Sequence, residues 1–217
     1  MRRFRAQLAS RFTRFVRPHW STPATRRIAA AGLVAAGLVV AIGPLPATAY
    51  DHQIVEIQNK GNRNLRADVV WASTAPFTGL FLWTDNSSAS QEFELLSSPD
   101  PAYFRIKARH SGQCLMLDWR SGTWTNGTPI IQYPFCDAGY AASEWSISYV
   151  QVDNGNGFGP SYQILKNRAT GRCLDAGNAA GGAPGQQAVL QQWDCVPNGN
   201  QWNSWNQMWG LVDPTHP

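Results

Sequence analysis

The fold is decided by a stretch that occurs twice, first as Tyr103-Phe-Arg-Ile-Lys-Ala-Arg-His-Ser-Gly-Gln-Cys114-Leu and again as Tyr162-Gln-Ile-Leu-Lys-Asn-Arg-Ala-Thr-Gly-Arg-Cys173-Leu. The two stretches align without a gap, and in each a second Cys follows 22 positions after the first. Each copy then closes on a Trp with an apolar residue one step beyond it, as Trp145-Ser-Ile147 and Trp209-Gly-Leu211. Spacing that is kept over about 45 residues predicts a repeated structural unit.

A fainter copy precedes these two. Leu80-Phe-Leu-Trp83-Thr-Asp85 aligns with Leu190-Gln-Gln-Trp193-Asp-Cys195, and Gln91-Glu-Phe93-Glu-Leu95 aligns with Gln207-Met-Trp209-Gly-Leu211. In this alignment Asn64 and Asp85 stand at the two Cys positions, so we expect no disulfide in the first copy. The three copies span approximately residues 50–97, 101–149 and 160–213.

Each copy contains short alternating segments separated by Gly, Asn and Ser turns, with no sustained helical period. This pattern predicts an all-β domain over residues 50–213. Units of this size cannot each bury a hydrophobic face alone, whereas closure around a pseudo-threefold axis removes the open sheet edges. The extra length lies in two Gly-, Asn- and Pro-rich insertions, 154–160 and 196–200, which we expect to be surface loops.

Residues 1–49 have the composition of a targeting segment. They contain eight Arg and no acidic residue, followed by an apolar run from Ile28 to Gly43 and then Ala47-Thr48-Ala49. This order predicts a secretory signal peptide and an extracellular location. The run is shorter than the roughly 20 residues that span a membrane, so we expect no stable membrane insertion after cleavage. An uncleaved anchor remains an alternative, and Sec and twin-Arg export are not distinguished.

The charge balance changes once this leader is set aside. Ten Lys and Arg face fourteen Asp and Glu after residue 49, a net charge of about −4. The basic pI therefore belongs to the leader and gives no indication of nucleic-acid binding. All four Cys lie in the mature part, an even number that indicates two disulfides in an exported protein.

The third copy contains Cys173-Leu-Asp175, Gln191-Gln-Trp193-Asp-Cys195 and Asn206-Gln-Met-Trp209. In this combination and order the chain resembles the ricin-B lectin family across its whole mature part. The resemblance implies a β-trefoil fold, carbohydrate binding, and disulfides within repeats, Cys114–Cys136 and Cys173–Cys195. A disulfide that closes a loop of this length contributes roughly 3 kcal/mol in the loop-entropy model.

The sugar-contacting positions of the family fall here on five residues of the third copy: Asp175, Gln191, Trp193, Asn206 and Gln207. A carboxylate accepts strong hydrogen bonds from sugar hydroxyls, and an amide both donates and accepts. A Trp ring offers an apolar face to the C–H groups of the sugar. We take Trp209, Trp145 and Phe93 as core residues, while Trp202 and Trp205 either extend the binding surface or cover one end of the barrel.

The other two copies depart from this set. The alignment places Met116 and Pro134 at the Asp and Trp positions of the second copy. It places Arg66 and Phe81 at the Asp and Gln positions of the first, although Trp83 and Gln91 remain. Asp68 and Asp118 lie four residues beyond the first Cys position; they are alternative ligand candidates, although we interpret them as turn formers. Binding by the first repeat through Trp83 also stays open. The sequence therefore predicts one binding site, in the third copy.

No catalytic, metal or cofactor motif accompanies these repeats, and we expect a lectin rather than an enzyme. Its expected partners are glycans, galactose-like or of the xylan or arabinan type. Two alternatives from other classes are a β-trefoil protease inhibitor that acts through an exposed loop such as 154–160, and a glycoside hydrolase of unusual type.

Overall fold

The computed structural model describes residues 51–151, 161–177, 182–196 and 204–215. The chain divides into two units, residues 1–41 and 42–217, and all described residues lie in the second. The predicted leader, the loop 154–160, Trp202 and most of the 196–200 insertion lie outside the described residues. Within the described ranges, no helix has the length and apolar character needed to cross a membrane.

The described residues form twelve strands and three short 3-10 helices, η2, η3 and η5 (Val70–Ala72, Ala141–Ser143 and Trp205–Gln207). In chain order the strands are β1 Ile54–Asn59, β2 Leu65–Val69, β3 Leu80–Thr84, β4 Glu92–Ser97, β5 Phe104–Ala108, β6 Cys114–Leu117, β7 Ile130–Tyr133, β8 Glu144–Gln151, β9 Ser161–Asn167, β10 Cys173–Ala176, β11 Leu190–Trp193 and β12 Trp209–Val212. All pairings between these strands are antiparallel.

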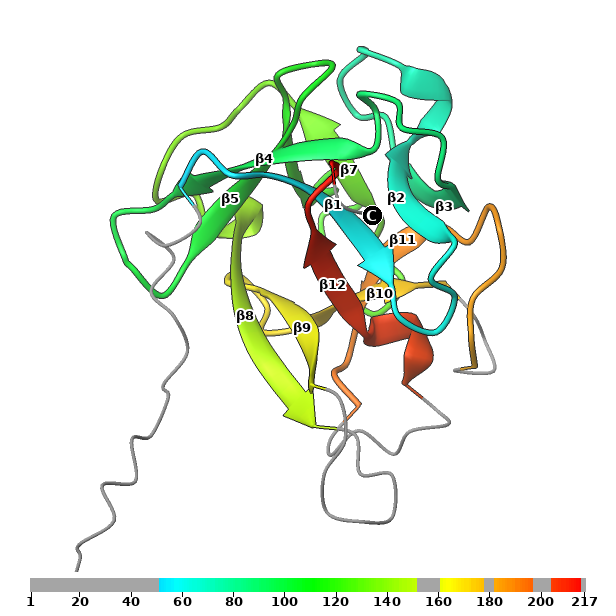
Figure 1. Ribbon diagram of the computed structural model, residues 1–217. Helices are drawn as coiled ribbons and strands as arrows, with labels where there is room; N and C mark the ends of the chain where they lie inside the picture. The colour runs from blue at the N-terminus through cyan, green and yellow to red at the C-terminus, as the bar shows by residue number, and fades with distance from the viewer. Residues whose placement is uncertain (1–50, 152–160, 178–181, 197–203, 216–217) are drawn as a thin grey trace, which may run out of the picture. The chain divides into compact units, whose positions relative to one another are not determined.

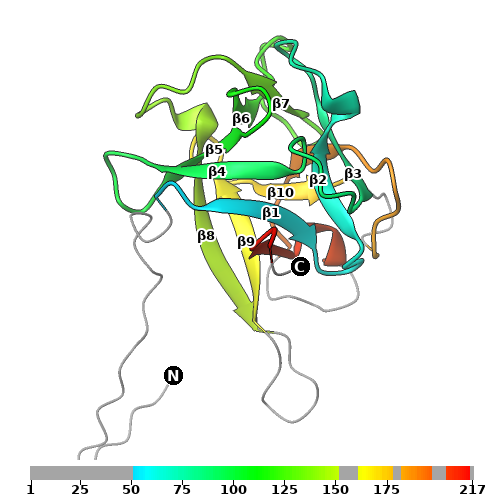
Figure 2. The ribbon, with the colours of Figure 1, turned by 45° about the horizontal axis from the view of Figure 1, so that its top comes forward.

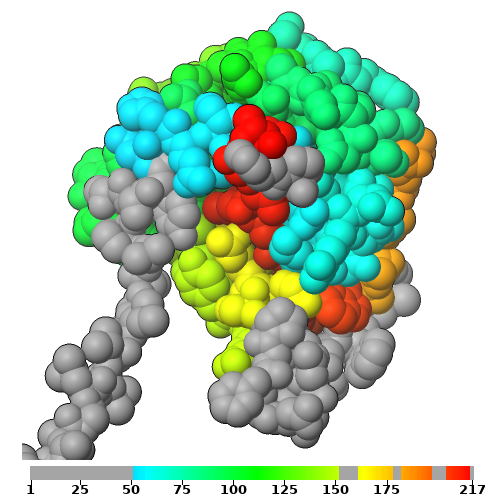
Figure 3. Space-filling view, viewed as in Figure 1, coloured from blue at the N-terminus to red at the C-terminus, as the bar shows by residue number. Residues whose placement is uncertain are grey.

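Six of the strands close into a barrel. β1 pairs with β4, β4 with β5, β5 with β8, β8 with β9, β9 with β12, and β12 with β1. Figure 1 shows β12 between β1 and β9, which joins the end of the domain to its beginning. On the face drawn in Figure 3 the same three segments adjoin as cyan, red and yellow surface. Closure leaves no open edge in this ring of strands.

The other six strands form three hairpins, β2–β3, β6–β7 and β10–β11, each joined to one barrel strand. The hairpins are attached to β1, β5 and β9, one in each repeat (Figure 2). Four strands per repeat, two in the barrel and two in a hairpin, confirm the predicted all-β fold, a β-trefoil.

The core is built from alternate strand residues of all three repeats. The largest fully buried side chains include Trp145, Trp209 and Phe93, one at the same place in each repeat. The indole of Trp145 donates to the carbonyl oxygen of Leu115 and that of Trp209 to Leu174, at 3.3 and 3.0 Å. The prediction that these three residues belong to the core is confirmed.

Both predicted disulfides are present, Cys114–Cys136 and Cys173–Cys195. Cys114 and Cys173 lie opposite Lys107 and Lys166 on the neighbouring barrel strand.

In the first repeat the residue at this place, opposite Gln58, is Arg66 and not Asn64. Our alignment of this segment was therefore wrong by two residues. Arg66 forms an ion pair of 2.9 Å with Asp85, which stands at the second Cys position. An ion pair thus takes the place that a disulfide has in the other repeats.

Candidate functional site

The hairpin β10–β11 brings the predicted residues of the third repeat together. In its register Asp175 lies opposite Gln191, and Cys173 lies opposite Trp193. Asp175 and Gln191 form a cross-strand pair, and their side chains meet in a hydrogen bond of 3.0 Å from Gln191 Nε2 to Asp175 Oδ1. The turn of η5 then delivers the last two residues, Asn206 and Gln207, to the same carboxylate.

The carboxylate of Asp175 is the centre of this group. Its Oδ2 accepts hydrogen bonds from Asn206 Nδ2 at 2.6 Å and from Gln207 Nε2 at 2.9 Å. Three amides of the same repeat therefore fix one acidic side chain, which is itself buried. Four of the five residues predicted for the site make direct contacts with one another, although 31 or 32 residues separate Asp175 from Asn206 and Gln207.

This arrangement keeps hydrogen-bonding capacity in reserve. A carboxylate oxygen can accept two hydrogen bonds, and among the described residues Oδ1 of Asp175 receives one, from Gln191. Asn206 Oδ1 is buried, and no donor from the described part of the chain reaches it. A buried acceptor without a partner is costly, so Asn206 Oδ1 is kept there at the expense of stability. The unused lone pair of Asp175 Oδ1 favours a ligand that donates hydrogen bonds, as sugar hydroxyls do.

Trp193 completes the site as an exposed aromatic surface, with 43% of its area accessible. The loop before β7 in the second repeat borders it. Gly127 lies so close that a Cβ there would be 3.9 Å from the Trp193 ring and 3.8 Å from Gln191 Oε1. Gly127 has a φ of +86°, a conformation that favours glycine. The second repeat therefore contributes backbone, rather than a side chain, to this edge of the site.

Polar contacts hold that loop beside Trp193. Asp194 accepts hydrogen bonds from Asn126 Nδ2 at 2.8 Å and from Arg172 Nε at 2.8 Å. Arg172 also donates to the carbonyl oxygen of Trp124 at 2.9 Å. The Trp193 ring, on the β10–β11 hairpin of the third repeat, thus lies against a loop of the second repeat that these hydrogen bonds hold in place.

Burial raises the pKa of Asp175, because its charged form is desolvated, and the hydrogen bonds from Gln191 and Gln207 oppose this shift. Among the described residues, no Lys, Arg or His forms an ion pair with Asp175, and amide groups contact its carboxylate. A neutral ligand rich in hydroxyl groups therefore suits it better than an anion.

The first repeat contains a second group of the same kind. Across β2 and β3 Asp68 lies opposite Phe81, and Arg66 lies opposite Trp83. Asp68 therefore takes the position of Asp175, whereas the sequence alignment had placed Arg66 there. Asp68 is buried within β2, so its interpretation as a turn former is also wrong.

The closing glutamine of the first repeat makes the same contacts as that of the third. Gln91 Nε2 donates to Asp68 Oδ2 at 2.9 Å and to the carbonyl oxygen of Thr84 at 3.0 Å. Gln207 Nε2 donates to Asp175 Oδ2 and to the carbonyl oxygen of Asp194 at 2.9 and 3.1 Å. The first and third repeats therefore bind their aspartate through the same pair of glutamine hydrogen bonds.

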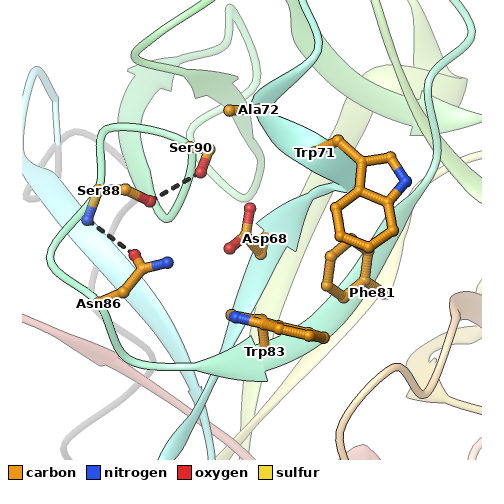
Figure 4. A pocket seen from close by; sticks show the side chains of 8 residues that line it. All are labelled: Asp68, Trp71, Ala72, Phe81, Trp83, Asn86, Ser88 and Ser90. Carbon is orange, nitrogen blue, oxygen red and sulfur yellow. Dashed lines mark hydrogen bonds between the residues drawn. The ribbon is translucent and has the colours of Figure 1, made fainter.

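A pocket of about 240 Å³ opens beside Asp68, lined by Asp68, Trp71, Ala72, Phe81, Trp83, Asn86, Ser88 and Ser90. Figure 4 shows Asp68 between an aromatic side, made of Trp71, Phe81 and Trp83, and a polar side made of Asn86, Ser88 and Ser90. Sequence reasoning named Asp68 only as an alternative ligand and did not assign Trp71 or the polar side of the pocket. Shifting β2 by two residues in the alignment places Asp68 at the position of Asp175, but the sequence pattern fits both registers equally well.

The second repeat lacks the carboxylate. Met116 lies opposite Ile131, and Cys114 lies opposite Tyr133, so Tyr133 and not Pro134 takes the platform position. Tyr133 packs against Phe77 and Trp119, with ring centroids 4.7 Å apart in both pairs. With buried Met116 at the aspartate position, this repeat offers no charged acceptor there.

Two further predictions concern single residues near these repeats. Trp205 packs edge-on against Tyr162 at 5.7 Å, on a small apolar cluster that contains Cys173 and Met208. It therefore covers one part of the barrel wall. Asp118 is held by Arg120 at 2.7 Å, and its backbone lies outside the strands, as a turn-forming Asp requires.

Within the described ranges, no three His, Cys, Asp or Glu side chains gather as metal ligands would. The charged side chains of both aspartate groups are instead contacted by amides.

Comparison with known proteins agrees with the fold. Residues 47–133 match the family described as "Ricin-type beta-trefoil lectin domain-like", which confirms the resemblance drawn from the repeats. No curated protein matches the chain. The match covers the first repeat and most of the strands of the second, while the predicted motif lies in the third.

Solved structures show the same fold. The designed three-fold symmetric protein ThreeFoil is 26% identical with a TM-score of 0.57, over 74% of this chain and 98% of that one. An exo-beta-1,3-galactanase from Clostridium thermocellum is 24% identical with a TM-score of 0.54, over 73% of this chain and 30% of that one. A Polyporus squamosus lectin bound to a sialylated epitope is 17% identical with a TM-score of 0.55, over 74% of this chain and 49% of that one. The chain thus spans under half the length of these last two proteins.

Proposed function

We propose that this protein binds carbohydrate through the third repeat, with Asp175, Gln191, Trp193, Asn206 and Gln207 as the contacting residues, and that it catalyses no reaction. The family match supports carbohydrate binding in general. The observation that carries the third-repeat assignment is the buried Asp175 carboxylate, which three amides fix beside an exposed Trp ring.

Each part of the group suits one part of a sugar. A ring hydroxyl donates to Asp175 Oδ1, which retains a free lone pair. Asn206 holds the other carboxylate oxygen of Asp175 from Nδ2 at 2.6 Å. The C–H face of the same sugar stacks on Trp193. The Asp175 acceptor is held in place before the ligand arrives, which reduces the entropy that binding must offset.

The ligands we propose are glycans with galactose-like residues, or polymers of the xylan or arabinan type. One shallow site of this kind gives a Kd on the order of 1 mM for a single sugar, so useful binding requires clustered glycans or several copies of the protein. We also propose that the protein acts outside the cell after removal of residues 1–49. The two disulfides are consistent with an oxidising location.

A glycan array with the mature protein tests the proposal, repeated with the variants Asp175→Ala and Asp118→Ala. Asp175→Ala removes the shared acceptor, so binding to the glycans recognised by the third repeat should be lost. Asp118→Ala removes an aspartate that is paired with Arg120 outside both groups, and it should bind as the unmodified protein does.

Three outcomes would contradict the proposal. If binding survives Asp175→Ala and is lost in Trp83→Ala, the recognition site lies in the first repeat. If reducing sugar is released from a bound polysaccharide, the protein is a hydrolase. Inhibition of a secreted protease together with a silent array would favour the inhibitor alternative.

A further inference from the structure

The first-repeat pocket differs from the third-repeat group in one chemical respect: it is aromatic where the other is polar. Phe81 replaces the cross-strand amide of Gln191, while Asp68 is retained in the position of Asp175. Phe81 is itself buried and lies against Trp83, with ring centroids 5.4 Å apart. A ligand at Asp68 therefore meets carbon atoms where a ligand at Asp175 meets an amide.

Trp71 adds a second aromatic wall to the pocket. Its ring lies 5.8 Å from Phe81 and 6.2 Å from Trp83, and 78% of its area is exposed. Trp71 and the following Ala72 have φ values of 57° and 51°. Two consecutive non-glycine residues in the left-handed region are unfavourable, and such strain is found where function requires it.

An exposed Trp on a strained backbone contributes little to the core. Figure 4 shows its ring at the aromatic side of the pocket, facing the space around Asp68. A large exposed aromatic that faces an open pocket is typical of a ligand-binding surface. Trp71 therefore presents an exposed ring to the pocket from a left-handed backbone.

The opposite side of the pocket provides the polar contacts. Asp68 accepts a hydrogen bond from Gln91. Burial raises the pKa of Asp68, and the neighbouring Ser90 and Gln91 side chains oppose that shift. The hydroxyls of Ser88 and Ser90 are 2.8 Å apart, and Asn86 Oδ1 accepts from the backbone N–H of Ser88 at 3.0 Å. The pocket therefore combines one acidic acceptor with a rigid polar rim.

We propose that the first-repeat pocket is a second carbohydrate site, and that it selects sugars carrying a methyl group, either on a deoxy carbon or in an N-acetyl group. This inference rests on the proposed function only in assuming that the ligand is a carbohydrate. Asp68 accepts from a sugar hydroxyl, as Asp175 does. A hydroxyl directed at Phe81 would lose its hydrogen bonds to water without replacement, whereas a methyl group there is buried between Phe81, Trp71 and Trp83.

The test follows the indole N–H signals of the mature protein by NMR, because Trp71 and Trp83 report on this pocket and Trp193 reports on the third repeat. D-fucose and D-galactose form a matched pair that differs by one hydroxyl, and N-acetyl-D-galactosamine provides the second source of a methyl group. At Trp71 and Trp83, one or both methyl-bearing sugars should bind about fourfold more tightly than D-galactose, the gain expected for burying one methyl group. The sugar that shifts these two signals, D-fucose or N-acetyl-D-galactosamine, identifies whether the methyl group belongs to a deoxy carbon or to an N-acetyl group.

Three variants sharpen the result. Phe81→Gln recreates the amide of the third repeat and should remove the preference for the methyl-bearing sugar. Trp71→Gly removes the ring and suits the left-handed backbone, so it should weaken the preferred sugar without unfolding the protein. Phe135→Ala removes an exposed aromatic that packs on Tyr140, away from the residues that line the pocket, and should change neither value.

Two results would overturn the inference. Equal affinity for D-fucose, N-acetyl-D-galactosamine and D-galactose at Trp71 and Trp83 would exclude selection by a methyl group. No shift of these two signals with any of the three sugars would exclude a sugar site of this kind. Either result is separate from the proposed function, since the Trp193 signal and the Asp175→Ala array test the third repeat.

Discussion

Gln207 donates a hydrogen bond of 2.9 Å from Nε2 to Oδ2 of Asp175 and so joins the end of the third repeat to its hairpin. The same side chain donates to the carbonyl oxygen of Asp194 and accepts from the backbone N–H of Val196, at 3.1 and 3.0 Å. Both N–H donors and one acceptor site of this amide are therefore used to position one carboxylate and the segment beside it. Gln207 thus orients the Asp175 carboxylate in addition to the ligand contact proposed for it.

Replacing Gln207 with Ala should destabilise the protein by about 1–3 kcal/mol, because Asp175 and Val196 lose buried hydrogen bonds. Gln91→Ala in the first repeat is the matched variant, since Gln91 makes the same contacts with Asp68, Thr84 and Asn86. Urea unfolding of both variants measures the loss. Unchanged unfolding midpoints would show that these amides are not needed to hold the aspartates.

Trp193→Ala should separate binding from stability. Because 43% of Trp193 is exposed, its removal should lower the free energy of unfolding by about 1–2 kcal/mol, less than for a fully buried ring. Affinity for the third-repeat ligand should fall by about tenfold through loss of the stacking face. Trp209→Ala is the contrast: this fully buried ring should cost about 3–5 kcal/mol of stability. Equal losses of stability in the two variants would place Trp193 in the core.

Arg66 is buried together with Glu56, to which it donates from Nε at 2.6 Å. Arg66→Ala should destabilise the protein by about 3–5 kcal/mol, because it leaves the Glu56 carboxylate buried without a cation. The double variant Arg66→Met with Glu56→Gln removes both charges and should recover much of that loss. Thermal unfolding of the three proteins measures the difference. A mild effect of Arg66→Ala would mean that water reaches Glu56 in solution.

The affinity of the third-repeat site should fall on acidification, at a pH above that expected for an ordinary Asp. Burial raises the pKa of Asp175 above its usual 3.8, and the protonated carboxyl has one acceptor lone pair fewer for a sugar hydroxyl. Folding stability has the opposite sign at this group. Because the folded state binds the proton more readily, the contribution of Asp175 to stability is present at low pH and is lost as pH rises through the raised pKa.

Calorimetric titration of the sugar between neutral pH and pH 4 measures this dependence. In Asp175→Asn the residual affinity should be independent of pH over that range. A pH profile that is the same in both proteins would assign the titration to another group.

The repeat pattern in the sequence was sufficient for the fold. Two gap-free copies with the same Cys spacing, together with the fainter first copy, predicted three units. The structure has three sets of four strands in a β-trefoil. The Cys-Leu-Asp and Gln-x-Trp motifs were also sufficient to name the residues that meet at Asp175. Strand alternation and motif order are local properties of the sequence. They can be read directly in the third repeat because the spacing between its motifs follows the repeat pattern.

Register was decided only by the tertiary structure. A shift of two residues keeps the same side chains on the same face of a strand, so the sequence pattern could not distinguish Arg66 from Asp68 at the aspartate position. The barrel makes the choice: Arg66 must lie opposite Gln58 and reach Glu56 and Asp85, which places Asp68 beside Trp83 and Gln91. The buried guanidinium of Arg66 needs Glu56 and Asp85 as partners, and this requirement selects the register of β2. The same register places Asp68 in the first-repeat pocket.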